Sequence, residues 1–433
     1  MSRMNDIEYI FEQNRKHTEL FRNGLPMIAS ENLISPLAMS MLVSDFHNRY
    51  AEGNPGARYY QGNEFVDNVE RKAIELAKEL FQSSYADVRP VSATVANLGI
   101  LFATCNPGDT ITTCDVSSGA HISTAPFGAV GVRGLKRQLY PFDLDEMNID
   151  VDGAIKVIKQ SKPKVCLFGM SVFLFPTPIR ELQDAIQEVG ATAWYDGAHV
   201  LGLIAGGEFQ DPLREGCDIL SGSTHKTLPG PQRGMIVANP KSKELEKSLN
   251  YGIFPGVLSN HHLHTMAALA ISLAEHLEFG KAYASQVIRN AKALGQALHE
   301  EGFKLLGEKN GFTASHTLAM DISMHMGGRK AVKELERAGV ITNKNLLPWD
   351  PSEKAQNPSG IRVGTQELTR LGMRESEMKE IADIFKQIII EKRSPDMVVE
   401  KVRELRRDFT KIGYCYGDDV EAHHFFDIRE MFS

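Results

Sequence analysis

Apolar and polar positions between residues 63 and 238 follow two alternating periods. Segments 63–81 and 180–189 carry apolar residues at every third or fourth position, which predicts amphipathic helices. Short apolar runs bounded by turn residues predict buried strands at 110–114, 164–168, 191–195, 218–220 and 234–238. Repeated strand–helix units of this kind favour a mostly parallel sheet covered by helices on both faces, so the predicted fold class is α/β.

The pattern changes after residue 255. A helical stretch runs from 264 to about 301, and the remainder mixes strands (317–322, 340–343) with helices (330–337, 376–392). This mixture predicts a smaller α+β domain at the C-terminus. The expected division is an N-terminal arm with a loop at 1–62, a large domain at 63–278 and a small domain at 279–433.

Composition narrows the class of protein. The formal net charge of -7 argues against a nucleic-acid binder, and no apolar run approaches the roughly 18 residues of a membrane span. The five cysteines form no CxxC pair, which is typical of reduced thiols in a cytoplasmic protein. His261, His262 and His264 have no acidic residue or cysteine at ligand spacing, so no metal site is predicted.

A lysine and an aspartate each follow a predicted strand. Lys226 stands in Ser223-Thr224-His225-Lys226-Thr227, and Asp196 stands in Tyr195-Asp196-Gly197-Ala198-His199. A lone lysine is most commonly a solvated surface charge. A lysine with an acid at strand ends, however, suits an enzyme that uses pyridoxal phosphate, whose aldehyde the amine binds and whose pyridine nitrogen the acid pairs with. Because Ser92 and Ser171 also fall at strand ends, one shared site is expected at the carboxyl edge of the sheet.

Three further segments place polar groups in shaped loops. Segment 50–62 combines glycines and a proline with three tyrosines, a glutamate and an arginine, which indicates a site loop rather than a spacer. Segment 88–97 has small hydroxyl residues at a helix start, which either cradle a phosphate or act as an ordinary N-cap. Arg362, between Gly360 and Gly364, is able to grip a carboxylate at two points.

Five motifs carry a resemblance to a known family. They are Ile28-Ala29-Ser30-Glu31-Asn32, Arg49-Tyr50-Ala51-Glu52-Gly53, Tyr195-Asp196-Gly197-Ala198-His199, Ser223-Thr224-His225-Lys226-Thr227 and Ser359-Gly360-Ile361-Arg362-Val363-Gly364-Thr365. From about Leu25 to Met373 the chain resembles serine hydroxymethyltransferases, and Ser259-Asn260-His261-His262 resembles their archaeal-type branch. The resemblance implies a cytoplasmic, fold-type-I pyridoxal-phosphate transferase. It further implies a homodimer or dimer of dimers with shared active sites; the charge and the absence of a long apolar run predict no nucleic-acid or membrane partner.

The resemblance also implies the cofactor contacts. Lys226 matches the Schiff-base lysine, Asp196 the acid at the pyridinium nitrogen, and His121 the histidine stacked on the ring. His199 matches a histidine beside the cofactor hydroxyl. The other expected contacts are Ser92, Ala93, Thr94 and Ser223 at the phosphate, together with Ser171, His225 and Asn260.

The substrate contacts are implied in the same way. Ser30 and Arg362 match the groups that hold the amino-acid carboxylate. Tyr50, Glu52 and Tyr60 match residues supplied across the subunit interface, and Glu52 matches the family's proton-transfer carboxyl. The expected catalytic residues are thus Lys226, Glu52, His121, Asp196 and Tyr60. The implied reaction interconverts serine and glycine with a reduced pterin, such as tetrahydrofolate, as the one-carbon carrier.

Three positions depart from the family pattern and leave alternatives open. Ala93 and Ala120 replace glycines, and Arg233 follows Gly-Pro-Gln where a further glycine is usual. A basic residue at that place is reminiscent of related transaldolases. One alternative is therefore an L-threonine transaldolase or aldolase, against which the intact loop around Glu52 speaks. Another is a hydroxymethyltransferase for an α-methyl amino acid such as 2-methylserine.

Overall fold

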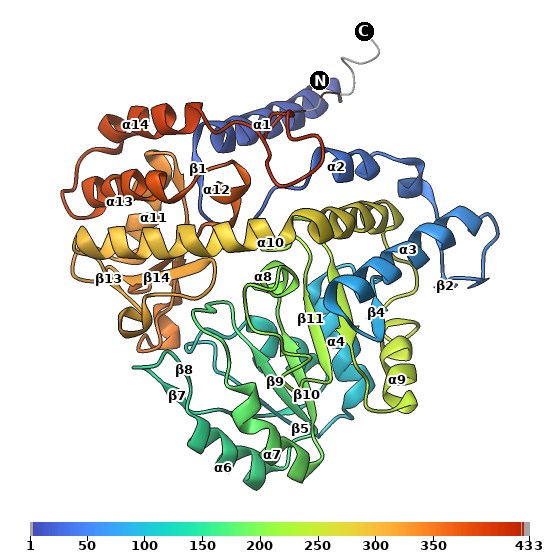
Figure 1. Cartoon of the computed structure of the whole chain (residues 1–433). Coiled ribbons are helices and arrows are strands. Elements are labelled where there is room, and N and C mark those ends of the chain that lie inside the picture. Colours follow the sequence, from blue (N-terminus) through green and yellow to red (C-terminus); the bar gives the residue numbers. More distant parts are fainter. Residues whose placement is uncertain (1–2, 426, 428–433) are drawn as a thin grey trace.

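A seven-stranded sheet forms the centre of the computed structural model, which describes residues 3–425 and 427 (Figure 1). Of the described strands in this sheet, six are parallel and β12 is antiparallel to both of its neighbours. Across the sheet they are β4 (Tyr85–Asp87), β12 (Gly234–Ala238), β11 (Ile219–Ser223), β10 (Thr192–Asp196), β9 (Val165–Gly169), β5 (Thr110–Thr113) and β6 (Lys136–Leu139). The predicted mostly parallel sheet is confirmed.

Alternate residues of the central strands point to opposite faces of this sheet. On β10, Trp194 packs with α4 (Ala93–Thr104) and α9 (Lys243–Ile253), whereas Tyr195 packs in the core on the other face. That second core also includes residues of α3 (Glu64–Phe81), α6 (Val151–Ser161), α7 (Ile179–Val189) and α10 (Leu263–Glu300). Side chains alternate along a strand, so a strand covered on both faces must be apolar throughout. This requirement explains the short continuous apolar runs in the sequence.

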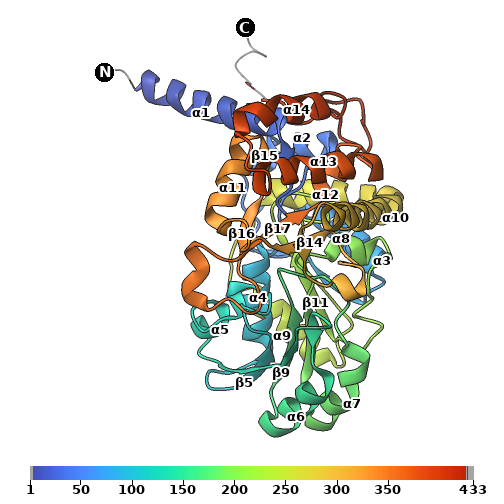
Figure 2. The same ribbon diagram turned by 90° about the vertical axis from the view of Figure 1, so that its left-hand side faces the viewer.

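The C-terminal part folds around its own antiparallel sheet and its own core (Figure 2). The sheet has the order β13 (Lys304–Leu305), β14 (Thr317–Asp321), β17 (Gly360–Gly364) and β16 (Asn343–Asn345). Its core includes residues of α11 (Gly328–Arg337), α13 (Glu375–Ile389) and α14 (Pro395–Arg407). The expected α+β character of this region is therefore present.

Two elements join the large and small parts of the chain. The expected boundary at 278/279 falls inside α10, which is one continuous helix that contributes side chains to both cores. Near the N-terminus, β1 (Leu25–Pro26) pairs in parallel with β15 (Val340–Ile341), so a segment expected to be an arm belongs to the small domain's core.

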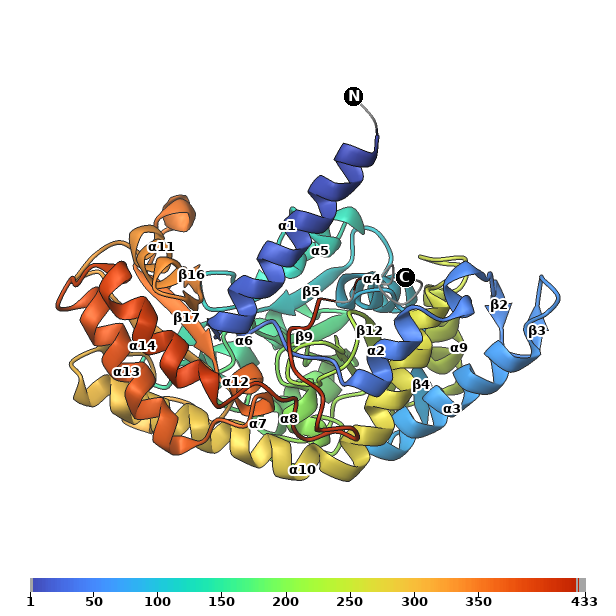
Figure 3. The same ribbon diagram turned by 90° about the horizontal axis from the view of Figure 1, so that it is seen from above.

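The segments outside these two domains are short or project from them. Helix α1 (Met4–Asn23) has no buried residue and extends away from the body, and the hairpin of β2 (Gly53–Asn54) and β3 (Ala57–Arg58) lies far from α11, α13 and α14 (Figure 3). No helix of the described residues is both long and apolar enough to pass through a membrane. Other short elements are α2 (Pro36–Leu42), α5 (Ala129–Val132), α8 (Leu201–Ala205), α12 (Gln366–Arg370), β7 (Phe142–Asp143) and β8 (Asn148–Ile149).

A glycine allows α8 to touch the main chain that follows Lys226. The N–H of Gly202 donates to Thr227 Oγ1 at 3.0 Å, and the Gly202 carbonyl accepts from His276 Nε2 at 2.9 Å. A Cβ at Gly202 would overlap the carbonyl group of Thr227. The loop that carries Lys226 is thereby packed directly on a helix.

Gly202→Ala is expected to lower the free energy of unfolding by roughly 1–3 kcal/mol, because a methyl group in this contact forces two main-chain segments apart. Urea unfolding followed by circular dichroism would measure the change. Gly413→Ala is the control, since its Cβ would lie 3.4 Å from the nearest atom, the Arg370 carbonyl oxygen. Equal unfolding midpoints for Gly202→Ala and the unchanged protein would contradict the packing argument.

Candidate active site

A cavity of about 200 Å³ opens at the carboxyl edge of the large sheet. It is lined by residues at the ends of, or following, β4, β5, β9, β10 and β11, as expected for a ligand site in a parallel sheet. Ten residues predicted to contact a cofactor line it together: Ser92, Ala93, Thr94, His121, Ser171, Asp196, His199, Ser223, His225 and Lys226.

Lys226 enters the cavity from the loop after β11, and its side chain is buried. Burial lowers the pKa of its amine to about 8, an effect that Asp196 opposes and Arg362 assists. The loop is held at two neighbouring points: Thr227 Oγ1 donates to the His199 carbonyl at 2.8 Å, and Asn32 Nδ2 donates to the Lys226 carbonyl at 2.5 Å. Near neutral pH a usable fraction of the amine is therefore neutral and nucleophilic.

Asp196 ends β10 with both carboxylate oxygens engaged. Asn97 Nδ2 donates to Oδ2 at 2.7 Å, and the N–H of Ala198 donates to Oδ1 at 3.0 Å. The Asn97 amide is itself oriented by Ser221, whose hydroxyl donates to Asn97 Oδ1 at 3.0 Å and accepts from Trp194 Nε1 at 2.9 Å. The acid is thus held in one orientation by a chain of buried hydrogen bonds.

The first turn of α4 forms one wall of the cavity. Ser92 is the N-cap, and its hydroxyl accepts from the N–H of Val95 at 3.2 Å. The N–H groups at the start of a helix have no partner within the helix, so those of Ala93 and Thr94 suit an anion. Gly234 lies so close to Ser92 and Ala93 that a Cβ would collide with their main chain. A phosphate cradle is therefore compatible with Ala93.

Three histidines, His121, His199 and His225, complete the lining of the cavity. His121 Nδ1 lies 2.8 Å from Ser123 Oγ, and burial lowers the pKa of His121 although Asp196 acts against it. Burial, with the charges of Lys226 and Arg362, lowers the pKa of His199 well below its usual value. Among the described atoms, Nδ1 of His199 and Nδ1 of His225 are buried with no hydrogen-bond partner. An amine, an oriented carboxylate, an anion cradle and unpaired ring nitrogens together fit pyridoxal phosphate.

Arg362 lies on β17, beside the cavity rather than in its lining. Its Nε donates to Asn343 Oδ1 at 3.1 Å, and its Nη1 donates to the carbonyl of Ser171 at 2.9 Å. Burial lowers the pKa of Arg362 to about 10, so the guanidinium is still charged near neutral pH. Ser30 belongs to a segment held against the same region, since Gln366 Nε2 donates to the carbonyls of Ile28 and Glu31 at 2.7 Å each.

Four predicted site residues lie away from the cavity of their own chain. Tyr50 and Tyr60 are 45% and 50% exposed, and their ring centroids lie 5.0 Å apart. Glu52, which lies in the same loop, is half-buried. Asn260 contacts the same loop, because its Oδ1 accepts from the N–H of Ala51 at 2.9 Å. These residues form a second polar group around the 50–62 loop.

Arg233 is a structural residue rather than a site residue. Its guanidinium is fully buried and donates to the carbonyls of Val88, Arg89 and His262 at 2.7–2.9 Å and to Thr265 Oγ1 at 2.7 Å. The basic residue at this position, reminiscent of transaldolases, is therefore not evidence for a transaldolase reaction. No group of His, Cys, Asp and Glu within the described range is arranged to hold a metal ion.

Known proteins are similar in sequence to this chain over nearly its whole length. A model of the family described as serine hydroxymethyltransferase matches residues 3–385. The serine hydroxymethyltransferase of Picrophilus torridus is 56% identical over 415 residues, which is 96% of this chain and 96% of that protein. The serine hydroxymethyltransferase of Thermoplasma acidophilum is 54% identical over 412 residues, which is 95% of this chain and 96% of that protein. That of Methanopyrus kandleri is 49% identical over 420 residues, which is 97% of each chain.

The amine of Lys226 is expected to react as a group with a pKa near 8 in the cofactor-free protein. Only the neutral amine is acylated, so trace labelling by acetic anhydride should rise about tenfold per pH unit below the pKa and level off above it. Mass spectrometry of the Lys226 peptide, with free lysine in the same tube as reference, would measure this. In Asp196→Asn the midpoint should move to lower pH, because the Asp196 charge raises the pKa of Lys226. A midpoint near the ordinary 10.5, or an upward move, would contradict the assignment.

Proposed function

Because the chain belongs to the serine hydroxymethyltransferase family, we propose that it interconverts serine and glycine at the Lys226 cavity. The family uses pyridoxal phosphate and a tetrahydrofolate-type carrier of the one-carbon unit. The observation that carries the proposal is the meeting of Lys226, Asp196 and the first turn of α4 in one cavity. The names of the relatives favour neither the transaldolase nor the hydroxymethyltransferase for an α-methyl amino acid. The buried position of Arg233 favours neither of them either.

Each part of the cofactor has a partner in this arrangement. Lys226 would hold it covalently, Asp196 would pair with the pyridine nitrogen, and His121 would cover the ring. His199 lies beside the ring hydroxyl. Ser92, Ala93, Thr94 and Ser223 would hold the phosphate, and Ser171 and His225 line the same cavity. When bound, pyridoxal phosphate supplies an electron sink for a carbanion at the substrate α-carbon. The Asp196 carboxylate supports this by keeping the pyridine nitrogen protonated.

The substrate carboxylate is assigned to Arg362 and Ser30. The guanidinium is charged and oriented by Asn343 and by the Ser171 carbonyl. No protein hydrogen bond to its Nη2 is present among the described residues. A charge-assisted contact to a carboxylate is worth roughly 1.5–3 kcal/mol. Arg362 therefore fixes which end of the amino acid enters the cavity.

The 50–62 loop is assigned to the active site of a partner subunit. Its residues Tyr50, Glu52 and Tyr60 are partly exposed and lie outside their own cavity, which supports a shared site in a homodimer or dimer of dimers. Asn260 contacts this loop and is assigned with it. Glu52 accepts and returns the serine hydroxyl proton as the hydroxymethyl group moves to the pterin. The five buried, unpaired cysteines support a cytoplasmic enzyme.

Glu52→Gln is the experiment that tests the proposed reaction. The amide keeps the size of the carboxyl but cannot ionise, so pterin-dependent conversion of serine should fall by roughly 10²–10⁴. The rate of threonine cleavage, which needs no pterin, should fall much less. The measurement is the ratio of the two activities, with the exposed Glu64→Gln on α3 as control. A ratio unchanged by Glu52→Gln, or indifference of the unaltered enzyme to every reduced pterin, would falsify the proposal.

A shared site predicts complementation between two inactive chains. Lys226→Ala lacks the cofactor lysine, and Tyr50→Phe lacks a loop hydroxyl. In a mixed dimer one cavity receives an intact Lys226 from one chain and an intact Tyr50 from the other. Random exchange should therefore restore about a quarter of the original activity, since half of the dimers are mixed and one site in each is intact. Mass spectrometry would verify that the subunits have exchanged. If no activity is recovered after verified exchange, the active site is not shared between subunits.

A further inference from the structure

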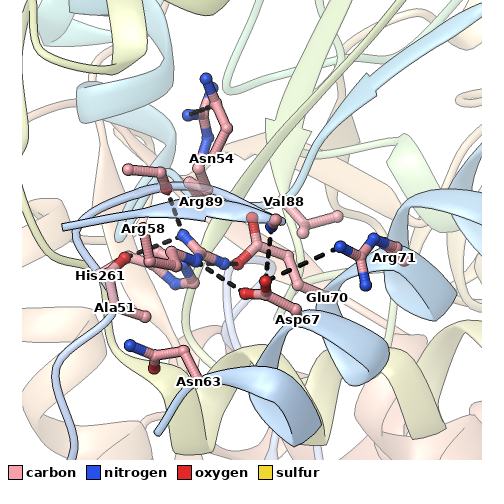
Figure 4. A network of polar contacts seen from close by, with 12 residues as sticks. Ala51, Asn54, Arg58, Asn63, Asp67, Glu70, Arg71, Val88, Arg89 and His261 are labelled. Atoms are coloured by element: carbon pink, nitrogen blue, oxygen red, sulfur yellow. Dashed lines mark hydrogen bonds and ion pairs between the residues drawn. The ribbon is translucent and has the colours of Figure 1, made fainter. Parts of the chain in front are cut away.

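The guanidinium of Arg58 lies inside the 50–62 loop and contacts the main chain on both sides of Glu52 (Figure 4). Its Nη1 donates to the carbonyl of Ala51 at 2.9 Å and also to the carbonyl of Gly53. The carbonyl of Glu52 itself accepts from the N–H of Tyr59 at 3.1 Å. Three successive carbonyl groups around Glu52 are therefore held.

The other edge of the guanidinium is fixed to helix α3. Arg58 Nε donates to Asp67 Oδ1 at 2.8 Å, and Nη2 donates to Glu70 Oε2 at 2.5 Å. The side chains of Arg58, Asp67 and Glu70 are 3%, 8% and 1% exposed. Charged groups bonded to each other out of contact with water are strongly directional, so α3 defines where the guanidinium lies.

The same carboxylates reach the loop by two further routes. Asp67 Oδ2 accepts from the N–H of Gly56 at 2.5 Å. Glu70 Oε2 lies 3.0 Å from Nε2 of His261, which directly follows the Asn260 that binds the N–H of Ala51. Although burial acts to raise it, His261 and Arg58 hold the pKa of Glu70 below its usual value, so this carboxylate is ionised. The loop and its anchor form one connected network.

The side chain of Glu52, in contrast, is not tied down. Within residues 3–425 and 427, no hydrogen bond or ion pair reaches its carboxylate. The main chain of Glu52 is thus rigidly placed while its carboxyl is left available to a ligand. We propose that Arg58 is a positioning residue, which sets the place of the Glu52 carboxyl for proton transfer in the reaction proposed above. The proposal rests on that function.

Lysine would not replace arginine in this position. A guanidinium offers five donors in a planar fork, and Arg58 uses four of them on two carbonyls and two carboxylates. An ammonium keeps the positive charge between Asp67 and Glu70 but cannot reach both sets of acceptors at once. Arg58→Lys therefore retains charge balance while releasing the carbonyls beside Glu52.

The test is a double-mutant cycle with Arg58→Lys, Glu52→Gln and the pair together, all as the full-length holoenzyme. Displacing a catalytic group by about 1 Å can lower the reaction rate on the order of 10²-fold. Arg58→Lys should therefore lower kcat of pterin-dependent serine conversion by roughly that factor. The KM for serine and the pterin-free cleavage of threonine should change by less than about threefold. Added to Glu52→Gln, Arg58→Lys should cause no further loss, because both act through one carboxyl.

Arg71→Lys is the matched control. Arg71 lies on α3, as do Asp67 and Glu70, and its Nη2 is 3.7 Å from Asp67 Oδ2, but its side chain is 52% exposed and contacts no carbonyl beside Glu52. Its activities should equal those of the unchanged enzyme. A cooperative thermal melt establishes that each variant folds. Should Arg58→Lys fail that check, Glu70→Gln takes its place in the cycle, since its amide oxygen still accepts from Arg58 but holds it less firmly.

The outcomes separate this proposal from the one on which it rests. Loss in Glu52→Gln with none in the Arg58 or Glu70 variant overturns the positioning role and leaves the reaction standing. Multiplicative losses in the double variant, or equal loss of threonine cleavage, show a general structural role and also overturn it. If Glu52→Gln itself leaves serine conversion unchanged, the role of Glu52 fails and the positioning role fails with it.

Discussion

The hydrogen bond from Asn97 to Asp196 is the constraint on which the cavity depends. A buried carboxylate is stable only when its oxygens are bonded, and Asn97 and the Ala198 N–H supply those bonds. Asn97 lies on the same helix whose first residues face the cavity as an anion cradle. Asn97 lies five positions after Ser92, or about 7.5 Å along the helix axis. One rigid helix therefore sets the spacing between the phosphate end and the acid end of the site.

A second set of contacts brings the small domain to this cavity. The amide of Asn32 binds both the Lys226 carbonyl and the Tyr283 hydroxyl, and Tyr283 on α10 donates to the carbonyl of Gln366 at 3.0 Å. Gln366 is the first residue of α12 and lies two positions after the end of β17, the strand that carries Arg362. The lysine assigned to the cofactor and the arginine assigned to the substrate are therefore placed by one connected group of hydrogen bonds, although one follows a strand of the large sheet and the other lies on a strand of the small sheet.

Much of this arrangement could be predicted from the sequence, because the relevant signals are local. Continuous apolar runs mark strands covered on both faces, and polar residues directly after them mark the carboxyl edge where Asp196 and Lys226 meet. The contacts of Asn97, Ser221 and Asn32 were not predicted, since their partners are 99, 124 and 194 positions away and no local pattern of the sequence links residues so distant. The role of Arg233 was left open for a related reason: whether an arginine is catalytic or structural depends on burial, which follows from tertiary packing.

The central claim is that Lys226, and no other lysine, holds the cofactor against Asp196. Borohydride reduction of the holoenzyme makes that covalent link permanent, and peptide mass spectrometry then locates the added pyridoxyl group. The account predicts a single modified peptide containing Ser223-Thr224-His225-Lys226-Thr227, with the label on Lys226. Label on any other lysine, or none on a protein that has bound pyridoxal phosphate, would contradict it.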